Sequence, residues 1–125
     1  VGLGDITVSG SAITFTSSHI GFKMVRAASG ATNLSATQAN GTTETASAAL
    51  TTLAVEDGLD LALSVDSGTA VRYWWRKNGG VWSADTTLTT NITTATGVAI
   101  AKFAISNAGV ATDSTLRVRS AAFVR

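Results

Sequence analysis

The sequence predicts an all-β protein, a single antiparallel β-sandwich, on three observations. Short runs of residues alternate between apolar and polar side chains, as strands with one buried face do. Turn-forming residues, mainly glycine, asparagine and serine, separate these runs at short intervals. Helix signals are poor, because threonines interrupt the one Ala- and Leu-rich stretch, residues 45–54, and lower its helix propensity. About eight short strands are expected, which is typical of a sandwich or a barrel.

The expected strands fall in stretches with an alternating pattern: residues 5–10, 11–18, 20–28, 59–65, 71–77, 81–83, 97–106 and 115–124. The stretch 59–65, LDLALSV, shows the clearest alternation, with leucines at every second position. It predicts a half-buried strand whose leucines face a core. In the stretch 20–28, Phe22, Met24 and Arg26 are expected to share one face of a strand.

The segment RYWWRKNGGVW, residues 72–82, predicts a β-hairpin rich in aromatic side chains and cations. Asn78-Gly79 tolerates positive φ at both central turn positions and so favours a two-residue loop. This register places Trp75 opposite Trp82, and we prefer it because it pairs two large rings on one face. The alternative loop, Gly79-Gly80, would place Trp75 opposite Ala84.

Alternation divides the first strand of this hairpin into two faces. Val71, Tyr73 and Trp75 share one face, and we interpret Tyr73 and Trp75 as core aromatics with Trp82 as a cross-strand neighbour.

Trp74 shares the opposite face with Arg72 and Arg76, whose guanidinium planes could stack on its indole. Three interpretations of Trp74 remain open: packing within the molecule, a protein interface, or a platform for a sugar ring. Tryptophan and arginine are the residues that dominate protein interfaces.

Length and composition indicate one domain, residues 1–125, without cysteine. The net charge is +1 and only 14% of residues are charged, so neither a nucleic acid nor a membrane is expected as a partner. No apolar run approaches the ~20 residues of a membrane helix, and residues 1–10 do not resemble a secretory signal. A surface of such low charge repels its copies weakly, which favours self-association.

No catalytic constellation is evident, so we expect no enzyme activity and no cofactor. His19 is the single histidine, and a Ser-rich neighbourhood does not make a triad. Glu56, Asp57 and Asp60 cluster in VEDGLD, and such a loop could contribute oxygen ligands to Ca²⁺. The cluster lacks the spacing of an EF-hand, so we interpret it as solvated acids and expect no metal.

Arg117 and Arg119 share one face of the last expected strand, together with Arg125. Two interpretations remain open: a charged face that protects an edge strand, or a contact with an acidic partner surface, such as a shell of other subunits.

The order of these features resembles that in virion proteins of tailed bacteriophages with a SPRY-like or lectin-like β-sandwich. The resemblance covers about half of the chain and centres on a W-x-R-x-N-G-x-x-W hairpin. The matching residues are Trp74, Arg76, Asn78, Gly79 and Trp82. Short aromatic hairpins also occur in Ig-like domains. The resemblance implies a structural or adhesion module of a phage, located in the virion.

Together these observations predict a jelly-roll or concanavalin-like sandwich, with an Ig-like sandwich as the alternative. The expected function is that of a non-enzymatic virion structural protein, which decorates or cements a capsid or belongs to a fibre or tail appendage. Its expected partners are other virion proteins and further copies of itself. The alternative is a carbohydrate-binding module for host glycans. The candidate contact residues are Arg72, Trp74, Arg76, Trp82, Arg117 and Arg119.

Overall fold

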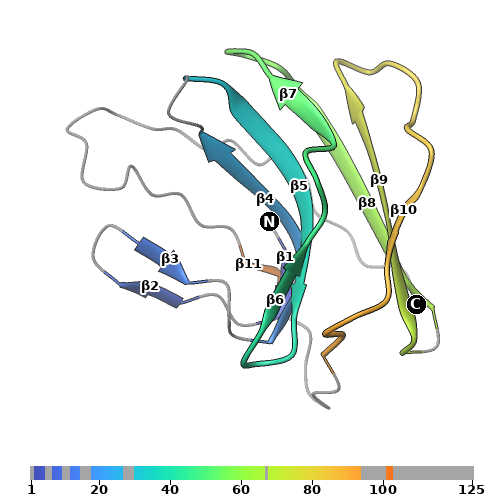
Figure 1. The fold of residues 1–125 in the computed structure, drawn as a ribbon. Coiled ribbons are helices and arrows are strands. Elements are labelled where there is room, and N and C mark those ends of the chain that lie inside the picture. Colours follow the sequence, from blue (N-terminus) through green and yellow to red (C-terminus); the bar gives the residue numbers. More distant parts are fainter. Residues whose placement is uncertain are drawn as a thin grey trace.

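A computed structural model shows an all-β chain of antiparallel sheets (Figure 1). It describes residues 2–4, 7–9, 12–14, 18–26, 30–66, 68–93 and 101–102, and no helix occurs among them. Two of the sheets face each other, and the core lies between them (Figure 1).

The first sheet has six strands in the order β11-β1-β4-β5-β6, with β7 also paired to β5. Its longest strands, β4 and β5, form a hairpin in which Arg26 pairs with Thr32 and His19 pairs with Ala39. The strands of this sheet are β1 (Gly2–Gly4), β4 (His19–Arg26), β5 (Thr32–Ala39), β6 (Glu44–Ala46), β7 (Thr51–Leu53) and β11 (Ala101–Lys102).

The second sheet has three strands in the order β10-β9-β8: β8 (Leu59–Asp66), β9 (Ala70–Lys77) and β10 (Thr86–Leu88). A tight turn joins β8 to β9, where Thr69 N donates to Asp66 O at 3.1 Å. A separate hairpin joins β2 (Thr7–Ser9) to β3 (Ala12–Thr14). The strand predicted for residues 115–124 lies outside the described residues, and of the strand predicted for residues 97–106 only 101–102 are described, as β11.

The core brings together the inner faces of the two sheets. Its buried members are Ile20, Phe22, Leu34, Ala36, Val71 and Tyr73. The rings of Phe22 and Tyr73 meet edge to face, with centroids 5.3 Å apart and planes at 87°. This is a favourable geometry for two aromatic rings. Trp75 and the three leucines of β8 are partly buried and pack against this cluster.

The Tyr73 hydroxyl joins the two sheets through a polar contact inside this core. It donates toward Thr37 O and Gln38 Oε1 of β5, each 3.1 Å away. Gln38 is fully buried, and its Nε2 donates to Thr90 O beyond the end of β10. Burial raises the pKa of Tyr73 well above its usual value, so the hydroxyl stays protonated and keeps its proton for these acceptors.

The preferred register of the aromatic hairpin is wrong, although its turn is correct. Asn78 and Gly79 both have positive φ, and Gly80 N donates to Lys77 O at 2.8 Å, as a two-residue loop requires. A regular hairpin would then have Trp82 N donate to Trp75 O, but Ser83 N does so. Ser83 Oγ accepts the hydrogen bond from Trp75 N, at 3.1 Å, in place of a backbone carbonyl.

Because Ser83 rather than Trp82 bonds to Trp75, the second strand of the hairpin contains extra residues compared with a regular hairpin. At Thr86, which pairs with Tyr73, the strand is displaced by two residues from the preferred register. Residues 81–83, predicted as a strand, are therefore irregular, and Trp82 does not stand opposite Trp75.

The same substitution at two valines, one in the core and one outside it, tests this description of the core. Val71 is fully buried, whereas Val81 is 93% exposed. We expect Val71→Ala to lower the free energy of unfolding by about 2 kcal/mol, because it removes buried methyl groups and leaves a cavity. Val81→Ala, the matched control, should change it by less than about 0.5 kcal/mol. Urea denaturation measures both, and equal effects of the two variants would contradict this description of the core.

Candidate functional site: the outer face of β8 and β9

Alternation on β9 places Arg72, Trp74 and Arg76 on the side of the second sheet that faces away from the core. On β8 their cross-strand neighbours are Ser64, Ala62 and Asp60, in that order. We refer to these six residues and Asp66 as the outer face.

Both arginines of the outer face are held by carboxylates of β8. Arg76 Nε lies 2.6 Å from Asp60 Oδ2, directly across the strand pair. Arg72 Nε lies 2.8 Å from Asp66 Oδ2, diagonally across it, and Ser64 Oγ donates to the other oxygen of Asp66. Exposed pairs of this kind stabilise the fold by no more than about 1 kcal/mol. Their main effect is to orient the two guanidinium groups.

Trp82 extends the outer face toward the aromatic hairpin. It is 41% exposed, and the guanidinium carbon of Arg76 lies 4.9 Å from its ring centroid. This is a cation–π distance. The sequence suggested stacking of the arginines on Trp74, but the cation–π contact that the structure describes joins Arg76 to Trp82.

Trp74 lies half-buried in the middle of this arrangement. Its cross-strand neighbour on β8 is Ala62, a small residue. The paired arginines and aspartates on both sides cancel each other's charge. The outer face is thus an aromatic centre flanked by oriented polar groups, without net charge. Such a face can make apolar and directional polar contacts together.

The acidic cluster predicted from VEDGLD is not assembled into one site. Asp57 accepts hydrogen bonds from Ala54 N (2.9 Å) and Asn78 Nδ2 (2.9 Å) and pairs with Lys77 Nζ at 3.3 Å. These hydrogen bonds, that from Ala54 first, lower the pKa of Asp57. Asp60 pairs instead with Arg76 on the outer face. Across the residues that the structure describes, no group of three His, Cys, Asp or Glu side chains could hold a metal ion.

His19 lies buried in a polar chain on the other sheet. Its Nε2 is 3.1 Å from Thr37 Oγ1, which donates to Glu44 Oε1 at 2.5 Å. Lys23 Nζ contacts the same carboxylate oxygen at 2.5 Å. The hydroxyl stands between the histidine and the acid, whereas an acyl-transfer triad has its histidine in the centre. The sequence identified neither Thr37 nor Glu44, because their approach depends on the pairing of β4, β5 and β6.

Burial opposes ionisation of Glu44, but its hydrogen bonds with Lys23 and Thr37 outweigh this effect. Together with the nearby charges of Lys23 and His19, they lower the pKa of Glu44 below its usual value.

Arg117 and Arg119 lie outside the described residues. Within the part of the chain that the structure describes, no helix has the length and hydropathy of a membrane span.

No family model, no curated protein and no solved structure matches this chain.

The low pKa of Glu44 predicts a pH-dependent contribution to stability. The ionised carboxylate stabilises the folded state above the unfolded pKa of about 4.3. That contribution disappears as the pH falls through the lower folded pKa. Glu44→Gln should therefore lower the free energy of unfolding at pH 7. The difference in this free energy between the variant and the unsubstituted protein should shrink as the pH falls from about 5 to about 3.

Urea denaturation at several pH values measures this difference. Glu56→Gln is the control, since Glu56 is exposed in the β7–β8 turn and forms no ion pair with any described residue. It should have little effect at any pH. A Glu44→Gln effect that stays constant from pH 7 to pH 3 would contradict the assignment.

Proposed function

We propose that this protein is a non-enzymatic binding module that associates with other proteins through the outer face of β8 and β9. The observation that carries the proposal is the placement of Trp74 between two oriented Arg–Asp pairs. A buried or half-buried indole with arginines beside it is the composition found at the energetic centres of protein interfaces. Because β8 holds both guanidinium groups in place, little side-chain entropy is lost when a partner binds.

We further propose that the partners are virion proteins, including copies of this chain, in a phage capsid decoration, fibre or tail appendage. The support for this location is the resemblance of residues 72–82 to the aromatic hairpin of phage virion sandwiches. Virion parts repeat by symmetry, so the same proposal includes a homo-oligomer. The lack of net charge on the outer face is compatible with contact between identical copies, because like faces would not repel each other.

We also propose that the fold is a jelly-roll or concanavalin-like sandwich rather than an Ig-like one. It is supported by the return of the chain to the first sheet after β10. There β11 pairs with β1, so strands from opposite ends of the described chain lie side by side.

The alternative function is the binding of host glycans by the same face. The observation in its favour is the half-buried Trp74, which stands opposite the small Ala62 and between planar groups that can hydrogen-bond to hydroxyls. An indole suits the C–H face of a sugar ring.

Sedimentation velocity of the full chain tests the proposed self-association. We expect the unsubstituted protein to sediment as an oligomer and Trp74→Ala to sediment as a monomer, because the variant removes the aromatic centre of the contact. Val55→Ala, at an exposed position outside this face, is the control and should remain oligomeric. Circular dichroism checks that each variant is folded. An oligomer that Trp74→Ala leaves intact, or a protein that stays monomeric at all concentrations, would contradict self-association through this face.

A glycan array, followed by titration of tryptophan fluorescence, separates the two functions. We expect no saccharide to bind, because the proposed partners are proteins. Saccharide binding that Trp74→Ala abolishes would overturn the protein-contact proposal in favour of the glycan-binding alternative.

A further inference from the structure

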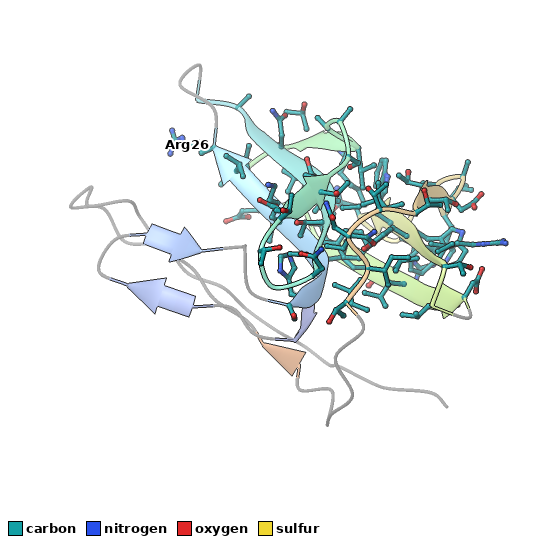
Figure 2. All side chains as sticks on the ribbon, turned by 60° about the horizontal axis from the view of Figure 1, so that its bottom comes forward. Arg26 is labelled. Carbon is teal, nitrogen blue, oxygen red and sulfur yellow. The ribbon has the colours of Figure 1, made fainter. Side chains whose placement is uncertain are left out.

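The inner face of β4 extends beyond the cover of the second sheet. Ile20 and Phe22 are buried on this face, whereas Met24 is 41% exposed and Arg26 is exposed. Figure 2 shows Arg26 at the end of β4, apart from the side chains packed between the two sheets. Among the residues that the structure describes, none of the second sheet therefore covers the inner face of β4 at this end.

A groove of about 300 Å³ occupies this open end. Its lining includes Arg26, Thr32 and Leu53, which follow one another across β4, β5 and β7 because Arg26 pairs with Thr32 and Thr32 with Leu53. Met24 and Leu59 add apolar surface. The volume lies at the lower end of the range of pockets that hold small molecules, about 300–1,000 Å³.

Arg26 supplies the charge of this groove. Each of the other four cations among residues 18–26, 30–66 and 68–93 forms an ion pair with an aspartate or glutamate, and Arg26 does not. Asp57 also lines the groove, but Lys77 pairs with it and Ala54 N and Asn78 Nδ2 donate to it. Its negative charge is thus compensated, and the groove combines apolar walls with one guanidinium group that forms an ion pair with no described residue.

We propose that this groove binds a small organic carboxylate with an apolar body. Arg26 receives the carboxylate, because a planar guanidinium group offers two parallel N–H donors to its two oxygens. The apolar body covers the exposed Met24 and the remaining accessible surface of the partly buried Leu53 and Leu59. This site lies between the sheets at one end of the sandwich, and it is independent of the proposed contact face on β8 and β9.

Isothermal titration calorimetry with the full chain tests the proposal, with decanoate as the probe and decanol as the uncharged control. Decanoate should bind saturably with one equivalent per chain, and decanol should bind at least tenfold more weakly. Arg26→Gln should weaken decanoate binding about tenfold or more, since it removes a charge-assisted pair of hydrogen bonds, and should leave decanol binding unchanged. Arg26→Lys keeps the charge without the two-donor geometry and should give an intermediate affinity.

A second variant tests the location of the apolar body. Ala54 is an exposed residue of the groove lining, so Ala54→Trp fills the groove without disturbing the core. It should reduce the binding of decanoate and decanol alike. The proposal is wrong if decanoate does not bind at millimolar concentration, if Arg26→Gln binds it as well as the unsubstituted protein does, or if Ala54→Trp leaves its affinity unchanged.

Discussion

The hydroxyl of Tyr73 makes the polar contact on which the arrangement of the two sheets depends. Apolar burial alone would permit the second sheet to slide over the first, because dispersion and hydrophobic contacts have little directionality. The hydroxyl donates toward Thr37 O and Gln38 Oε1, and Gln38 in turn holds Thr90 O after β10. Any sliding would leave these buried polar groups without partners, at a cost of about 1–3 kcal/mol for each group.

This anchor has a direct consequence for the outer side of β9. Successive side chains of a strand point to opposite faces, so the position of Tyr73 determines that of Trp74. The pairing of β8 with β9 then orients the arginines on either side of Trp74. One strand thereby carries both the core tyrosine and the tryptophan of the outer face. Because its arginines are already oriented, the proposed contact face should lose little side-chain entropy when it meets a partner.

The sequence predicted those features that depend on local pattern. The leucines of β8 and the inward position of Tyr73 follow from period-two alternation, and the turn at Asn78 follows from its conformational preference. It did not predict β5, a central strand, because Thr32–Ala39 is rich in small and polar residues. Gln38 is buried there only because Tyr73 and Thr90 satisfy it, and no local pattern reveals such distant partners.

The predicted hairpin register was wrong for a similar reason, because the side chain of Ser83 takes the place of a backbone acceptor.

The most direct test of the contact between the sheets is a double-mutant cycle between Tyr73→Phe and Gln38→Met, measured by urea denaturation. Both substitutions preserve most of the buried volume, so the cycle isolates the hydrogen bond. If the hydroxyl holds the two sheets together, the coupling free energy between the two positions should be about 1 kcal/mol. Additive effects, within about 0.3 kcal/mol, would show that the hydroxyl does not fasten the sheets together.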